Sequence, residues 1–165
     1  MIIKSNYINT SGQKVEQEYY DEEDLVGKLD PKDFGGIHAF CFYNDKLILV
    51  NHPKKGWAPV GGGMEKGETY EETTEREVKE ETNMKVLHQE LIGYSIFKIE
   101  DGRIVKQTRS MCIVEPYGEF VSDPDGEIME IKFIEPSEYK ENFDWGETGE
   151  RIMQKALELK KKYLS

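Results

Sequence analysis

Short apolar runs and alternating apolar and polar positions along the chain predict several β-strands joined by tight turns. Residues 37–43 and 47–51 flank the dipeptide Asn44-Asp45, and this arrangement predicts a hairpin of two core strands. Residues 90–100 and 103–115 flank Asp101-Gly102 and predict a second hairpin. A further strand is expected over residues 128–134, because Pro136 ends the apolar pattern.

The two ends of the chain show different patterns. Residues 1–35 alternate around the turn Thr10-Ser11-Gly12, which predicts an N-terminal hairpin packed on the domain and followed by an acidic segment. Residues 146–164 place apolar side chains at helical spacing and predict a C-terminal helix. A length of 165 residues fits one hydrophobic core, so we expect a single domain over residues 1–165.

Charge and apolar content narrow the classes of function. The chain has 33 acidic and 22 basic residues and a net charge of −11, which argues against nonspecific binding to nucleic acid or to an anionic membrane. A membrane-spanning helix needs about 20 apolar residues in succession, and no such stretch occurs in this sequence. The first residues lack the apolar core of a signal peptide, so we expect a cytoplasmic location. Cys41 and Cys112 each lie within an apolar stretch, which predicts buried thiols rather than a disulfide.

One segment combines a glycine-rich stretch with the start of a helix. Four glycines occur among the seven residues 61–67, and they predict a loop whose backbone can approach a ligand closely. Thr69 and Glu72 have the spacing of a capping box, so a helix is expected over residues 70–82.

Three glutamates follow on one face of that predicted helix. Glu77, Glu80 and Glu81 stand at positions i, i+3 and i+4, so their carboxylates share one turn and repel one another. A solvated acidic helix face would explain an arbitrary triplet of this kind. Here the triplet follows a glycine-rich stretch suited to phosphate oxygens, and carboxylates are hard ligands for Mg²⁺ or Mn²⁺. The combination favours a site for a metal ion and a phosphorylated ligand.

The segment over residues 62–84 resembles the Nudix box, G-x5-E-x7-R-E-U-x-E-E-x-G-U, where U is a bulky aliphatic residue. The matching positions are Gly62, Glu68, Arg76, Glu77, Val78, Glu80, Glu81 and Met84. Asn83 replaces the last glycine of the pattern. That position ends the helix in a left-handed conformation, for which Asn is the next best residue after Gly.

The resemblance implies a fold and an activity. The fold is a Nudix-type α/β/α sandwich with a mixed β-sheet. The activity is Mg²⁺-dependent hydrolysis, with Mn²⁺ as a substitute, of the diphosphate linkage in a nucleoside diphosphate derivative such as a nucleoside triphosphate. In that reaction a metal-activated water attacks phosphorus.

The resemblance also implies roles for particular residues. Metal ligands would be Glu77, Glu80, Glu81 and the carbonyl of Gly61. Arg76 would orient a helix carboxylate, and Glu68 would brace the loop against the helix. Two candidates for the general base, Glu81 and Glu127, stay open. Outside the resemblance, the residues themselves suggest contacts with the substrate. The glycine segment with Gly62 and Gly63 suits phosphate oxygens, and the basic residues Arg109 and Lys106 of a later strand are candidates for contacting a phosphate or a base.

Two other functions stay open at this point. A Nudix-fold nucleotide sensor would bind its ligand without cleaving it, although such a protein has no need of three mutually repelling carboxylates. The isoprenoid diphosphate isomerase branch of the fold would need a catalytic cysteine, for which Cys41 is the candidate. The partner is expected to be a small-molecule nucleotide, and the sequence allows a homodimer. We expect Trp57, Trp145 and His38 to be packing or surface residues.

Overall fold

The computed structural model describes residues 1–25, 30–121, 123–124, 128 and 130–165. Glu127, one of the two predicted bases, lies outside these residues. In the described part of the chain, no helix is both long enough and apolar enough to cross a membrane.

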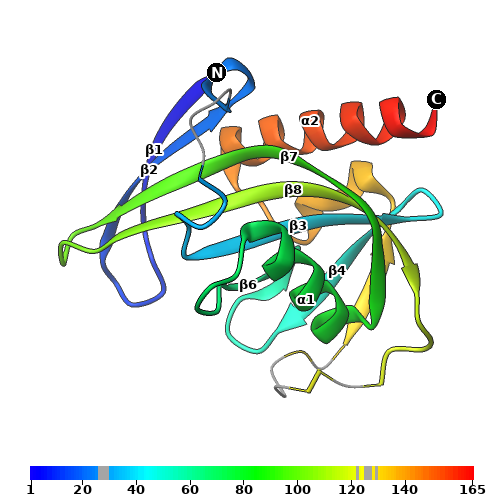
Figure 1. Cartoon of the computed structure of the whole chain (residues 1–165). Coiled ribbons are helices and arrows are strands. Elements are labelled where there is room, and N and C mark those ends of the chain that lie inside the picture. The colour runs from blue at the N-terminus through cyan, green and yellow to red at the C-terminus, as the bar shows by residue number, and fades with distance from the viewer. Residues whose placement is uncertain (26–29, 122, 125–127, 129) are drawn as a thin grey trace.

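The described strands form a nine-stranded sheet (Figure 1). Its main path runs through β1 (Ile2–Ile8), β2 (Lys14–Asp21), β7 (Met84–Ile99), β8 (Ile104–Pro116), β3 (Gly36–Tyr43), β4 (Lys46–His52) and β5 (Gly56–Ala58). Off this path, β6 (Val60–Gly63) pairs with β3, and β9 (Ile131–Ile134) pairs with β4. The sheet is mixed because β3 and β8 run parallel while neighbours such as β7 and β8 run antiparallel.

Two helices cover opposite faces of the sheet, α1 (Tyr70–Thr82) and α2 (Gly146–Leu164) (Figure 1). Short 3-10 turns, η1 (Glu22–Leu25) and η2 (Pro136–Glu141), follow β2 and β9. Alternate residues of β3 enter different cores: Ile37 packs in the cluster that contains Val78 of α1, and Phe40 packs in the cluster that contains Ile152 of α2. The predicted α/β/α arrangement is therefore present, with one core on each side of the sheet.

Several local predictions are confirmed. Asn44 and Asp45 both have positive φ, as a tight hairpin turn requires, and they join β3 to β4. The N-terminal hairpin forms, and because β2 pairs with β7 it extends the main sheet. Both helices have the predicted bounds, 70–82 and 146–164. Cys41 and Cys112 are buried free thiols.

Three local predictions are wrong. Residues 61–63 belong to strand β6 and not to a loop, since the glycine backbone pairs with β3 although it offers no side-chain pattern to read. Strand β7 begins at Met84, directly after α1, and not at residue 90, because its first half pairs with β8 although its sequence pattern is irregular. Strand β9 begins at Ile131 and not at residue 128.

Candidate active site

The chain between β6 and α1 is fixed by the capping of the helix and by one carboxylate. The Thr69 side chain accepts from the Glu72 backbone N–H, and the Glu72 side chain accepts from the Thr69 N–H, so the predicted capping box is present. Within the loop, the Glu65 backbone N–H donates to Glu68 Oε1 over 2.7 Å. The charge-assisted bond from Arg76 to Glu68 is the main reason why the pKa of Glu68 is lowered to about 2. Glu68 is therefore ionised near neutral pH and anchors the loop.

Arg76 connects this loop to the helix and to β6. Its Nε and Nη2 donate to the two oxygens of Glu68 over 2.8 and 2.9 Å, which is a bidentate pair. Its Nη1 lies 2.9 Å from Glu77 Oε1 and 3.2 Å from Glu80 Oε2, and its Nη2 also donates to the Gly63 carbonyl over 2.9 Å. One guanidinium thus brings together three of the carboxylates that the sequence singled out.

Glu77 lies against the backbone of Gly62. A Cβ atom at Gly62 would stand 2.3 Å from Glu77 Oε1, so only glycine permits this approach. Burial is the main cause that raises the pKa of Glu77 to about 7, the charges of Glu80 and Asp123 add to the effect, and Arg76 opposes it. The site therefore disfavours the ionised form of Glu77 despite the bond of this carboxylate to Arg76.

Glu81 is the most buried of the three helix glutamates, with 4% of its surface exposed. Its Oε1 accepts a hydrogen bond from the Gly61 backbone N–H over 3.2 Å. A carboxylate this deeply buried is uncommon in proteins. The helix and the glycine strand are thus joined at Gly61 by Glu81 and at Gly62 by Glu77.

Asp123 is a neighbour of this cluster that the sequence analysis did not single out. It is buried, and its Oδ2 accepts from the Ile128 backbone N–H over 3.2 Å. Its charge contributes to the raised pKa of Glu77. Asp123 lies four residues before Glu127, just ahead of the predicted last strand. This place in the sequence is the signal that could have identified it.

The side chains at this site suit a hard divalent cation by their chemistry. Among the described residues, no three His, Cys, Asp or Glu side chains are arranged to hold a metal ion as they stand. Arg76 occupies one oxygen each of Glu77 and Glu80. The donors are nevertheless all oxygens, which Mg²⁺ and Mn²⁺ prefer, and the charges of Glu80 and Asp123 act on Glu77 from nearby.

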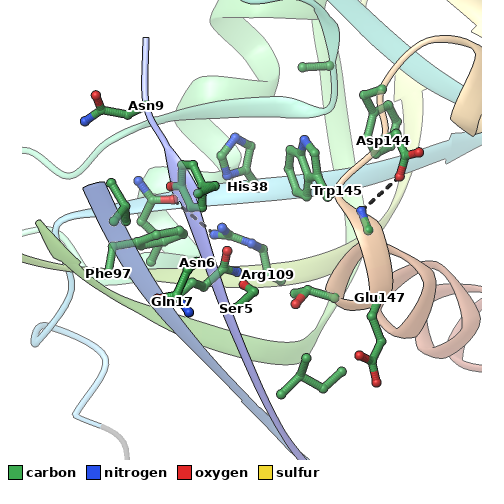
Figure 2. Close-up of a pocket in the computed structure, with 18 of the residues that line it drawn as sticks. Ser5, Asn6, Asn9, Gln17, His38, Phe97, Arg109, Asp144, Trp145 and Glu147 are labelled. Carbon is green, nitrogen blue, oxygen red and sulfur yellow. Dashed lines mark hydrogen bonds between the residues drawn. The ribbon is translucent and has the colours of Figure 1, made fainter. Parts of the chain in front are cut away.

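The two basic residues considered for substrate binding do not lie together. Arg109 and Lys106 are three residues apart on β8, so their side chains point to opposite faces of the sheet. Lys106 is paired with Asp33 over 3.0 Å. Arg109 lines a cavity of about 810 Å³, together with His38, Trp57 and Trp145 (Figure 2). Trp57 and Trp145 pack against the core on the α2 side, as expected, and with His38 they also line this cavity.

Fold and site together define a mixed α/β/α protein with clustered helix carboxylates beside a glycine strand. Comparison with known proteins agrees with this class. The sequence model of the NUDIX domain matches residues 34–155. The chain therefore belongs to the NUDIX family, the family of the Nudix hydrolases.

The individual relatives match this chain either over a short segment or at low sequence identity. The uncharacterized Nudix hydrolase YvcI of Bacillus subtilis is 41% identical over 61 residues, a segment that spans 36% of this chain and 38% of YvcI. The Bacillus subtilis pyrophosphohydrolase BsRppH has a similar fold, with a TM-score of 0.69, 17% identity, and coverage of 94% of this chain and 97% of that chain. The NUDIX domain of Shewanella oneidensis NrtR, solved with ADP ribose, gives a TM-score of 0.56 at 17% identity and covers 84% of this chain and 98% of that chain.

Proposed function

We propose that the protein hydrolyses the diphosphate linkage of a nucleoside diphosphate derivative, such as a nucleoside triphosphate, and that the reaction depends on Mg²⁺ or Mn²⁺. The observation that carries the proposal is the environment of Glu77. Its carboxylate is buried beside Gly62 and next to Glu80, with a pKa raised to about 7. Such a group favours a nearby cation, and a diphosphate needs one to approach a protein of net charge −11.

Each residue has a role in this proposal. Glu77, Glu80, Glu81 and the Gly61 carbonyl would hold the cation. When bound, the cation would offset the negative charge of the diphosphate oxygens and lower the pKa of a water, so that a base can remove its proton as it attacks phosphorus. Arg76, held by Glu68, orients Glu77 and Glu80. The Glu77 carboxylate takes the space beside Gly62, whereas the space beside Gly63 is more open. Both glycine backbones would lie next to the phosphate oxygens.

Proton transfer needs a base near the attacking water. Glu81 is the candidate among the described residues, because it is buried and its position is fixed by the Gly61 N–H. Glu127 is the other candidate from the sequence.

The structure bears on one of the two alternatives, the isomerase. An isomerase using Cys41 is disfavoured because this thiol is fully buried in the core on the α1 side, where the Cys112 thiol and burial raise its pKa well above the ordinary value. A nucleotide sensor would bind the same class of ligand without turnover, so only an assay separates it from an enzyme. We also propose a cytoplasmic location and leave a homodimer to be tested by light scattering.

The test is a hydrolysis assay on the full chain with Mg²⁺ or Mn²⁺. Nucleoside triphosphates, nucleotide sugars, dinucleotides and capped RNA are offered, and release of phosphate or pyrophosphate is followed. We expect turnover that is abolished by EDTA and reduced by a factor of about 100 or more in Glu81→Gln. The matched control is Glu75→Gln, which removes an exposed carboxylate from the same helix and should retain the activity.

Two results would contradict the proposal. The first is binding of a nucleotide without turnover of any compound in the panel, which would favour the sensor. The second is a near-normal rate for Glu81→Gln at saturating Mg²⁺, which would remove this carboxylate from the reaction.

A further inference from the structure

The cavity on the α2 face of the sheet lies beside the candidate active site. It opens between the N-terminal hairpin β1–β2 and the start of α2, and its volume of about 810 Å³ suits a small-molecule ligand (Figure 2). His38 of β3 forms part of its wall. A Cβ on Gly61 would stand 2.7 Å from His38 Cδ2, so one imidazole ring separates the cavity from the glycine strand β6. A ligand that passes the edge formed by β6 could therefore reach both places.

Arg109 lies at the centre of this cavity and is 3% exposed (Figure 2). Its Nη1 donates to Gln107 Oε1 and to the Thr108 carbonyl, both over 3.2 Å. Its guanidinium carbon lies 5.6 Å from the ring centroids of both Phe97 and Trp145. Its Nε is buried and has no hydrogen-bond partner. All of these neighbours are electrically neutral.

No carboxylate among the described residues forms an ion pair with Arg109. Asp144 and Glu147 line the cavity but are exposed on the α2 side, and Asp144 Oδ1 accepts from the Gly146 backbone N–H (Figure 2). Burial lowers the pKa of Arg109 to about 10, so the group is still protonated near neutral pH. The cavity also contains Lys4 and Lys55. Both lysines are exposed, so the positive charge in the deep part of the cavity is that of Arg109, in contrast to the negative charge of the chain as a whole.

A buried cation without an opposite charge is unfavourable, and its contacts with aromatic rings and neutral acceptors compensate only part of the cost. A phosphate or carboxylate presents two oxygens in the geometry that a guanidinium binds best. We propose that this cavity binds an anionic phosphate or carboxylate group of the substrate through Arg109.

This inference names a substrate class and in that part rests on the proposed function. The substrate would carry a second anionic group, distant from the diphosphate that is cleaved. The diphosphate would lie at the carboxylate cluster around Glu77, and the second anion would lie across the edge of the sheet at Arg109. A residue with this role determines specificity and does not take part in the chemical step.

The first experiment tests the anion site without catalysis. The full chain in EDTA is heated in sodium phosphate and in sodium chloride of equal ionic strength, and the melting temperature is compared. We expect phosphate to raise the melting temperature of the wild type by several degrees and to leave that of Arg109→Met unchanged. In sodium chloride, Arg109→Met should melt at the same temperature as the wild type or higher, because an uncompensated buried charge has been removed.

Two further variants keep this experiment decisive. Arg103→Met removes an exposed guanidinium of the β7–β8 turn and should retain the full phosphate shift. Arg109→Lys keeps the charge but not the planar pair of donors, and should show a smaller shift even where Arg109→Met fails to fold. The anion site is refuted if the wild type shows no phosphate shift, or if either Arg109 variant shows the wild-type shift.

The second experiment asks whether the anion belongs to the substrate. Three pairs differ by one anionic group distant from the diphosphate: NADP⁺ and NAD⁺, coenzyme A and its 3′-dephospho form, and UDP-glucuronate and UDP-glucose. For at least one pair we expect kcat/KM to favour the anionic member by about tenfold to a hundredfold in the wild type, and the preference to disappear in Arg109→Met.

The outcomes distinguish this inference from the proposed function. A phosphate shift that depends on Arg109, without hydrolysis of any compound, would leave the anion site standing and refute the hydrolase. Hydrolysis with no preference within any pair would refute the proposed substrate class. The Arg109 site would then bind a free anion and not a group of the substrate. The third outcome is a preference for guanine nucleotides that depends on Arg109 but is the same with and without the second anionic group. It would mean that the guanidinium binds the edge of a base, which also refutes the inference.

Discussion

Replacement of Glu77 by glutamine should stabilise the metal-free protein at high pH and have much less effect at low pH. Glutamine has nearly the shape of a protonated glutamate and cannot ionise. The folded-state pKa of Glu77 is raised from an ordinary value of 4.5 to about 7. Below pH 4.5 the carboxyl is protonated in the folded and the unfolded chain, so the raised pKa has no consequence for stability. Between pH 4.5 and 7 the unfolded chain loses this proton first, so the folded state becomes progressively less stable, and above pH 7 the full penalty is present.

The size of the effect follows from the same pKa. The difference between the two pKa values corresponds to at most about 3 kcal/mol. The opposing effect of the Arg76 ion pair is already included in the raised pKa. The Glu77 side chain is 12% exposed, so solvent reduces the penalty, and we expect about 1 to 2 kcal/mol. For a chain of this length, that corresponds to about 2 to 8 °C in melting temperature.

Differential scanning fluorimetry in EDTA at pH 5 and pH 8.5 measures this effect. The gain in melting temperature of Glu77→Gln over the wild type should be larger at pH 8.5 by most of the amount given above, because about a quarter of the penalty is already present at pH 5. Glu75→Gln, on the exposed side of the same helix, should show the same difference from the wild type at both pH values. An equal gain for Glu77→Gln at the two pH values would refute the argument, because it would mean that Glu77 is not held in a region that disfavours its charge.

Three other perturbations test neighbouring features. Mn²⁺ at a hundredfold excess over its Kd should stabilise the protein by about 2.7 kcal/mol and raise its melting temperature. This rise should be smaller in a Glu77→Gln/Glu80→Gln double variant. An equal rise produced by Na⁺ at the same ionic strength would contradict a specific metal site. Asn83 has φ 56°, so Asn83→Val should destabilise the protein by about 1 kcal/mol or more, whereas Asn83→Gly should be nearly neutral. Equal midpoints of thermal denaturation for the two variants would contradict this account of the helix end. Gly62→Ala should lower turnover by at least about tenfold, since the new Cβ would stand 2.3 Å from Glu77 Oε1; an unchanged rate would show that the carboxylate moves away at no cost to catalysis.

The helix that carries the carboxylates could be predicted from local sequence because its start and end are encoded locally. The capping box formed by Thr69 and Glu72 and the left-handed Asn83 each depend on residues within one turn of the helix ends. The contact of Arg76 with Glu80 also follows from helical spacing. These features need no knowledge of the sheet.

The cavity could not be predicted in the same way because it depends on long-range pairing. Arg109 and His38 are neighbours through the parallel pairing of β8 with β3, and Val15 and Gln17 reach the same cavity because β2 pairs with β7. Alternation along β8 does predict that Arg109 and Lys106 point to opposite faces. It does not tell which face has the cavity, since that depends on where α2 and the N-terminal hairpin pack.

The short strand β6 lies between the carboxylate cluster on the α1 face and the cavity on the α2 face. Its glycine backbone is contacted from both faces of the sheet. The Gly61 N–H donates to Glu81 of α1, and the absent side chain of Gly61 leaves space for the His38 ring of the cavity wall. A side chain at this position would push against His38 and narrow the cavity without adding any contact to the carboxylates. Glycine therefore allows helix α1 and the cavity wall to approach the same strand, as the proposed binding of one ligand to both places requires. This arrangement explains in physical terms why the chain has glycines here although they weaken a strand.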